Sequence, residues 1–138
     1  MSENFYVNTV GAVPAGKLSE AVSLGVTLAE ESKAAGSTRA SVGTIMTGNN
    51  AGSVVFQQFF QSLNDFADVM DAFATSDTYG KIVGTGLTVT MRNIAKFCDV
   101  PFDAPTNPQR KYVILTRGKA HISQPELMEL MAEASPMF

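Results

Sequence analysis

The first half of the chain predicts a strand, a helix and then two further strands. Residues 5–13 are rich in strand formers, with side chains alternating between two faces. Residues 14–17 (Pro-Ala-Gly-Lys) break this strand, and apolar positions at helical spacing follow until Gly36 offers a C-terminal stop. Residues 40–47 and 53–61 then alternate again, which predicts the second and third strands.

The two later strands are expected to form a hairpin, since residues 48–52 (Gly-Asn-Asn-Ala-Gly) are turn formers that tolerate positive φ. The third strand carries large apolar side chains on both faces. One face would hold Phe56, Gln58 and Phe60, and the other Val55, Gln57, Phe59 and Gln61. A strand of this kind is covered on both sides, so the pattern indicates helices on one face and a partner surface on the other.

Helical and strand patterns alternate again in the second half. Ser62 or Asn64 can cap a helix that continues to Ala74, and Ser76 with Asp77 predicts the start of a short helix. Residues 87–98 fit a strand or one face of a helix, and we favour the strand.

The C-terminal part of the chain predicts a loop, a strand and a helix. Residues 99–109 contain three prolines, which is typical of a loop that is too short to separate two cores. Residues 111–120 resume strand character. Ser123, with Glu126 three residues on, predicts the start of a last helix.

This order of elements is that of an α+β, ferredoxin-like β-α-β-β-α-β sandwich with an antiparallel sheet, followed by an extra C-terminal strand and helix. One domain over residues 1–138 is expected at this length. The strand that runs into Val13-Pro14-Ala15-Gly16-Lys17, the turn at Asn49-Asn50 and the segment Asn64-Asp65-Phe66 resemble the dimeric α/β-barrel superfamily. That superfamily includes antibiotic-biosynthesis monooxygenase-type, stress-responsive and NIPSNAP-like domains.

The resemblance covers about residues 4–98 and implies a homodimer, in which two sheets close face to face into a shared barrel. A low share of charged residues, 17%, fits a protein that covers part of its surface with a second copy. In such a dimer, the second copy would cover the second apolar face of the third strand.

Composition excludes several classes of function. Ten basic against thirteen acidic residues give a net charge of −3, so no nucleic-acid partner is expected. Cys98 and His121 are the only cysteine and histidine, which leaves no disulfide and no Cys/His metal cluster, and we expect Cys98 to be a buried thiol. No signal peptide or membrane-spanning run is present, which predicts a cytoplasmic protein without a membrane partner.

The chain also lacks the glycine-rich and nucleophile motifs of dinucleotide-binding, P-loop and α/β-hydrolase proteins. Candidate chemistry therefore depends on scattered polar side chains, and no metal or cofactor is expected. His121 is the obvious general base or axial haem ligand if chemistry occurs, although an exposed or capping histidine is the plainer interpretation. Tyr6, Asn8, Tyr79, Arg92 and Tyr112 are polar groups that can point into a small cavity between sheet and helices.

Three hypotheses follow. In the first, the protein binds a small hydrophobic molecule in this cavity, with Tyr6, Phe56, Tyr79 and Arg92 as binding residues. The alternative is a cofactor-independent monooxygenase-like enzyme that acts on an aromatic or quinol-like substrate, with Asn8, Tyr112 and His121 as catalytic groups. The resemblance supplies Asn8 as a positional match on the first strand, but the absence of tryptophan leaves the superfamily's Asn, Trp and Tyr or His set incomplete. A third hypothesis is haem binding through His121.

Overall fold

A computed structural model describes residues 3–98, 111–113 and 115–134, and divides the chain into two compact units. The first unit is Met1–Phe97 and the second is Cys98–Phe138, and each is described by itself. The expectation of one domain over the whole chain stays a prediction.

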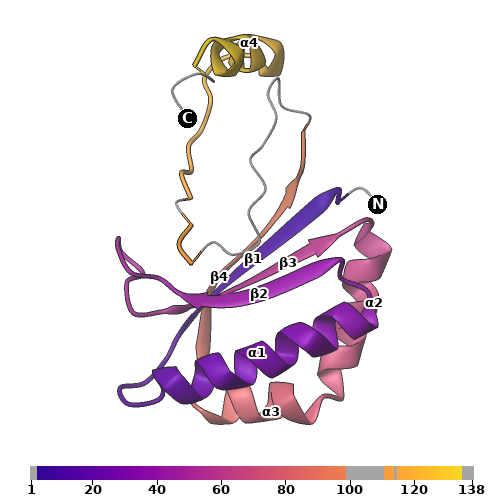
Figure 1. Cartoon of the computed structure of the whole chain (residues 1–138), viewed down its shortest axis with the longest axis vertical. Coiled ribbons are helices and arrows are strands. Elements are labelled where there is room, and N and C mark those ends of the chain that lie inside the picture. The colour runs from indigo at the N-terminus through magenta and orange to yellow at the C-terminus, as the bar shows by residue number, and fades with distance from the viewer. Residues whose placement is uncertain (1–2, 99–110, 114, 135–138) are drawn as a thin grey trace. The chain divides into compact units, whose positions relative to one another are not determined.

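The first unit contains a four-stranded antiparallel sheet (Figure 1). Its strands are β1 (Phe5–Ala12), β2 (Arg39–Thr44), β3 (Val54–Phe60) and β4 (Thr88–Lys96), arranged in the order β2-β3-β1-β4. The hairpin of β2 and β3 is confirmed, and β4 settles the ambiguous stretch after residue 87 as a strand. This strand order is the one expected of the ferredoxin-like fold.

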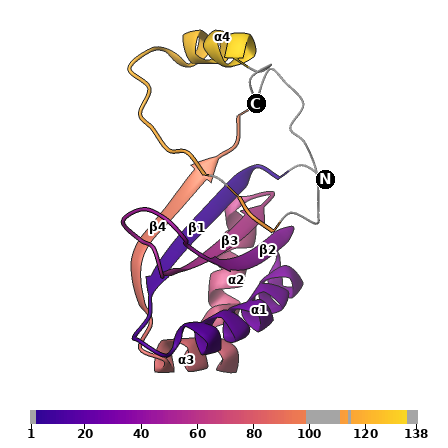
Figure 2. The same cartoon turned by 60° about the vertical axis from the view of Figure 1, so that its left-hand side comes forward.

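Three helices cover one face of this sheet, as Figures 1 and 2 show from two directions. They are α1 (Leu18–Ala35), α2 (Leu63–Ala74) and α3 (Asp77–Gly84). The Ser62 hydroxyl accepts the Asp65 backbone N–H at 3.2 Å, and the Ser76 hydroxyl accepts that of Tyr79 at 3.1 Å. These bonds satisfy N–H groups that a helix start leaves unpaired, so Ser62 rather than Asn64 is the cap of α2.

Apolar side chains from both layers meet between the sheet and the helices. The buried cluster consists of Val7, Leu28, Phe60, Val69, Phe73 and Ile82. Phe60 and Phe66 pack edge to face, with ring centroids 5.5 Å apart. Burial of this cluster, at about 1.5–3 kcal/mol for each large apolar side chain, is the main force holding the helices on the sheet.

Helix α1 approaches the sheet closely at Gly25. A Cβ placed on this glycine would lie 2.8 Å from Cγ2 of Val42 on β2, a distance that real Cβ contacts do not reach. Valine is β-branched and has little rotamer freedom to move away. The missing side chain at Gly25 therefore sets the distance between α1 and β2.

The second unit contains the helix α4 (Gln124–Ala134). The Ser123 hydroxyl accepts the Glu126 backbone N–H at 3.4 Å, and the Glu126 carboxylate accepts the Ser123 backbone N–H at 3.1 Å. This reciprocal pair is the capping box that the sequence predicts. Cys98 is exposed, and its sulfur accepts a hydrogen bond from Gln124 Nε2 at 3.3 Å, so the expected burial of this thiol is wrong.

The predicted strand over residues 111–120 is also wrong for the residues that the structure describes there, 111–113 and 115–120. They form no ladder with another strand and are exposed. Strand-forming residues build a strand only where a neighbour accepts their backbone hydrogen bonds, and an apolar run does not specify such a neighbour. The predicted loop over residues 99–109 lies outside the described residues.

Replacing Gly25 by alanine tests the close approach of α1 and β2. We expect Gly25→Ala to destabilise the first unit by about 1–3 kcal/mol, because overpacking against Val42 outweighs the roughly 1 kcal/mol gain in helix propensity. Gly80→Ala is the matched control on α3, where an added Cβ meets no atom within 4 Å. The control should stabilise by about 0.5–1 kcal/mol in urea unfolding, and equal signs for both variants would contradict the packing argument.

Candidate functional site

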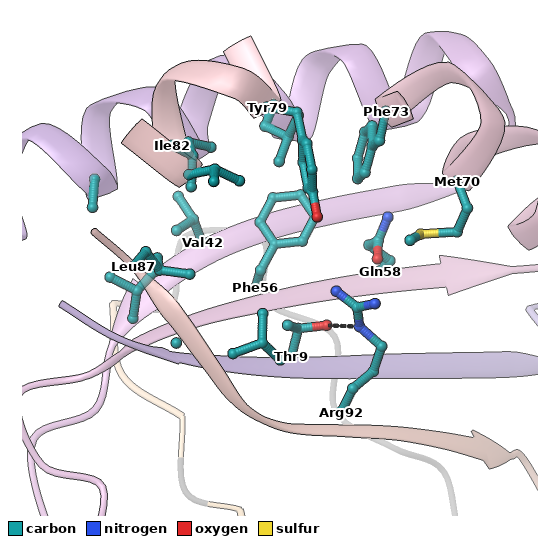
Figure 3. A pocket seen from close by; sticks show the side chains of 17 residues that line it. Thr9, Val42, Phe56, Gln58, Met70, Phe73, Tyr79, Ile82, Leu87 and Arg92 are labelled. Atoms are coloured by element: carbon teal, nitrogen blue, oxygen red, sulfur yellow. Dashed lines mark hydrogen bonds between the residues drawn. The ribbon is translucent and has the colours of Figure 1, made fainter. Parts of the chain in front are cut away.

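A cavity of about 100 Å³ lies between the sheet and the helices of the first unit. Its wall is mostly aliphatic and aromatic, and Figure 3 shows these side chains turned toward one another. They include Val42, Phe56, Met70, Phe73, Ile82 and Leu87. A small number of polar side chains joins them, which is the usual composition of a small-molecule pocket.

One row of paired residues across the sheet forms the floor of the cavity. Val42 on β2 pairs with Phe56 on β3, Phe56 pairs with Thr9 on β1, and Thr9 pairs with Arg92 on β4. Side chains of paired residues lie on the same face of a sheet. All four strands therefore contribute one side chain to the same surface.

The helices supply an aromatic roof. Phe73 on α2 stacks on Tyr79 of α3, with ring centroids 5.8 Å apart and planes inclined by 20°. Phe73 also meets Phe56 edge to face at 6.3 Å. Such pairs contribute about 0.5–1.5 kcal/mol each beyond their buried area, so they hold floor and roof in a defined geometry.

Polar atoms gather at one end of the cavity. Arg92 Nε donates to Thr9 Oγ1 at 3.0 Å, and in Figure 3 the guanidinium points toward the amide of Gln58. Gln58 is buried, and its Nε2 donates to Ser32 Oγ on α1 at 2.9 Å. Ser32 Oγ is also 2.8 Å from Ser37 Oγ. This buried network connects the cavity floor to α1.

The structure thus brings together three of the predicted binding residues, namely Phe56, Tyr79 and Arg92. Thr9 and Gln58 are lining residues that sequence reasoning missed. The sequence did carry a signal for Gln58. It follows Phe56 by two residues, and residues i and i+2 of a strand share a face. Roles for all of these side chains stay predictions.

Tyr6 and Asn8 do not share the cavity, and the expectation that they point into it is wrong. They alternate with Val7 and Thr9 on β1 and therefore lie on the opposite face of the sheet. Asn8 is only 2% exposed, and its Oδ1 accepts the Tyr6 hydroxyl at 3.0 Å. Gln57 Nε2 in turn donates to the Tyr6 hydroxyl at 2.8 Å.

Aromatic side chains cluster on this second face, and we call Tyr6, Phe59 and Phe97 the aromatic surface. Phe59 and Phe97 stack with centroids 6.1 Å apart and an interplanar angle of 7°. Arg39 Cζ lies 4.0 Å from the centre of the Phe59 ring. Hydrogen bonds from Arg39, at 2.7 and 2.9 Å, lower the pKa of Glu3 and hold the Arg39 guanidinium in place.

The other two candidate catalytic residues belong to the second unit. Tyr112 is 73% exposed, and His121 is exposed at the bend before α4. The catalytic roles predicted for Asn8, Tyr112 and His121 stay predictions. Among the described residues, no group of three or more His, Cys, Asp or Glu side chains is placed to hold a metal ion. Within the same ranges, every helix is too short or too polar to cross a lipid bilayer.

The sheet order, with its helices on one face, defines a ferredoxin-like α+β protein. A family model described as "Domain of unknown function (DUF6854)" matches residues 3–97, more than half of the chain. The chain belongs to this family. No functionally curated protein matches the sequence.

Solved structures with the same fold share little sequence with this chain. A dimeric ferredoxin-like protein from an uncultured marine organism has a TM-score of 0.53 and 15% identity, covering 75% of this chain and 100% of its own. A NIPSNAP domain protein from Burkholderia xenovorans has a TM-score of 0.51 and 15% identity, covering 73% and 99%. A Bacteroides thetaiotaomicron protein described as a possible oxidoreductase has a TM-score of 0.52 and 11% identity, covering 70% and 100%. The resemblance to ferredoxin-like and NIPSNAP proteins is confirmed at the level of fold.

The buried network at Gln58 gives a measurable expectation. Ser32→Ala removes the acceptor of the Gln58 amide and the partner of Ser37, so we expect a loss of about 1–3 kcal/mol in the free energy of unfolding. Ser41→Ala is the control, because Ser41 is exposed and its bond to Gln57 is long, at 3.4 Å. The control should change stability by less than about 0.5 kcal/mol in urea unfolding, and equal losses would show that the network does not stabilise the site.

Proposed function

We propose that the protein binds a small, mainly apolar molecule in the cavity of its first unit. The observation that carries this proposal is the row Val42, Phe56, Thr9 and Arg92, which presents one side chain from each strand to an aromatic roof. The floor is apolar at the β2 side and polar at the β4 side. An apolar wall with a few fixed polar groups provides both affinity and orientation.

The volume of the cavity supports a ligand of about one ring or a short chain. An engineered cavity of roughly 150 Å³ in another protein takes up benzene. The present cavity, of about 100 Å³ and open to solvent, is of the size needed for a ligand of one ring. An unfilled apolar cavity of this size costs about 2 kcal/mol of stability. A ligand that fills it restores those packing contacts and is bound for that reason.

No geometric observation favours the alternative, a cofactor-independent monooxygenase-like enzyme. Asn8 faces away from the cavity, and Tyr112 and His121 belong to the second unit, which is described by itself. Ligand binding needs only the residues that line the cavity. It is therefore the function that this geometry supports best.

The aromatic surface supports a second copy of the chain as partner. Phe97 is 47% exposed and stacks on Phe59, and apolar aromatic groups with an arginine are typical of interface cores. One protein of similar fold is described as dimeric. We place the proposed homodimer contact on this face of the sheet, which leaves the cavity on the other face accessible.

Filling the cavity tests ligand binding. Toluene is a neutral probe, and its addition should shift the methyl NMR signals of Val42, Ile82 and Leu87. Leu87→Phe adds volume inside the cavity and should weaken toluene binding at least about fivefold, because the ring occupies the ligand's space. Leu63→Phe is the control on an exposed position of α2 that does not line the cavity. If the spectra of the wild-type protein stay unchanged in buffer saturated with toluene, the proposal is wrong.

Assembly can be tested separately by native mass spectrometry and sedimentation. The wild-type protein is expected at twice the chain mass, and Phe97→Lys should shift it to the monomer, because the substitution places a charge in the interface core. Val26→Lys, on the exposed side of α1, should leave the dimer intact. A wild-type monomer, or a dimer insensitive to Phe97→Lys, would contradict the placement of the contact.

A further inference from the structure

We infer that the ligand of the cavity carries a hydroxyl group on its apolar body, as an alcohol or a phenol does, and that Gln58 recognises this group. The inference rests on the proposed binding function and specifies the class of ligand. The amide oxygen of Gln58, a buried acceptor that faces the cavity, carries it. Gln58 is thus assigned as a specificity-determining residue, whose oxygen accepts the hydroxyl proton of the ligand.

The amide of Gln58 uses only one of its two ends inside the protein. Nε2 donates to Ser32 Oγ at 2.9 Å, and no described residue donates a hydrogen bond to Oε1. Gln58 as a whole is 2% exposed and lines the cavity, and its Oε1 is not completely buried, so the accessible part of this oxygen faces the cavity. An amide oxygen can accept two hydrogen bonds, and those of Oε1 are left for water or a ligand.

The direction of the amide follows from its surroundings. Ser32 Oγ lies 2.8 Å from Ser37 Oγ, so Ser32 can donate its own proton to Ser37 while it accepts from Gln58 Nε2. In Figure 3 the guanidinium of Arg92 points toward the amide, and its positive charge favours the oxygen end of the amide dipole on that side. Only the charge of Arg92 enters here, and it is the same whatever hydrogen bonds the guanidinium makes. Gln58 therefore presents its acceptor, rather than its N–H donors, to the cavity.

A second neutral polar group faces the same space. In Figure 3 the hydroxyl of Tyr79 lies toward the end of the cavity that holds Gln58, whereas Leu87 and Ile82 lie at the other end. The Tyr79 hydroxyl makes no hydrogen bond with the described residues, and a phenolic hydroxyl can both donate and accept. A hydroxyl on the ligand can therefore donate to Gln58 Oε1 and accept from Tyr79 at once.

Other groups on a ligand fit this end of the cavity less well. A ketone or an ether can accept from Tyr79, but it has no proton for Gln58. An ammonium group has protons, but it would bring a second positive charge into a cavity that Arg92 lines. A wholly apolar ligand would leave the Gln58 oxygen desolvated without a partner.

Phenol and toluene are a matched pair of probes, because they have nearly the same shape and differ in a hydroxyl against a methyl group. Each is titrated into the full-length protein, and Kd is taken from the methyl NMR shifts of Val42, Ile82 and Leu87. In wild type, the Cδ carbon signal of Gln58 should move more with phenol than with toluene, because the amide oxygen accepts the phenol proton. Fluorobenzene is polar but has no proton to donate, and it should behave like toluene.

Gln58→Met keeps the length of the side chain and removes the acceptor. The ratio of the phenol Kd to the toluene Kd should therefore rise at least about tenfold, because the bound hydroxyl loses its partner. Gln57→Met is the control, since Gln57 is the neighbouring glutamine of β3, on the opposite face of the sheet, and does not line the cavity. The control should change the ratio less than about twofold.

An equal ratio in wild type and Gln58→Met, or an equal rise in Gln57→Met, would overturn the inference while leaving cavity binding intact. The same holds if fluorobenzene is weakened as much as phenol. If Gln58→Met does not fold, the wild-type Cδ signal of Gln58 decides, and a shift with phenol no larger than that with toluene overturns the inference. If none of the probes shifts the cavity signals, the proposed function fails together with this inference.

Discussion

The pairing register of β1 with β3 is the constraint on which the other features of the first unit depend. Thr9 opposite Phe56 and Tyr6 opposite Phe59 place these pairs on opposite faces of the sheet. Because side chains alternate with a period of two, a shift of one residue would exchange the faces. The cavity floor would then carry Tyr6 and Asn8, and the aromatic surface would lose two of its members. The register thus places the lining of the cavity and the aromatic surface on opposite faces of the same two central strands.

The position of α1 above this sheet depends on one small residue and one polar contact. Gly25 lets the helix approach Val42, and Ser32, two turns further along the helix, accepts a hydrogen bond from Gln58. A buried amide is costly unless it is bonded, so the Gln58 contact favours one register of helix on sheet over others of similar apolar area. The two contacts fix both the distance and the position of α1 along β3, and the cavity walls follow from that placement.

Local patterns in the sequence predicted the elements of the first unit well, because alternation, helical spacing and capping serines are local properties. The family match over residues 3–97 agrees with the extent of the predicted resemblance, about residues 4–98. The faces were harder to predict. Both sides of residues 5–12 mix apolar and polar groups, so the pattern could not show which face the helices cover, and Asn8 and Tyr6 were assigned to the wrong one. The run after residue 111 had strand composition, but pairing needs a partner that composition does not specify.

The small size of the cavity decides how a ligand can be selected. An aromatic ring of about 150 Å² of buried surface gains roughly 4 kcal/mol at about 25 cal/mol per Å². Loss of translational and rotational freedom costs at least about 4 kcal/mol, so apolar burial alone leaves little net affinity. Restored packing contacts around the ring add a similar free energy for every ring that fits the cavity. They therefore do not distinguish one such ring from another. For a ligand of the proposed kind, discrimination would therefore depend on the polar end of the cavity, where Arg92 donates to Thr9 and Gln58 donates to Ser32.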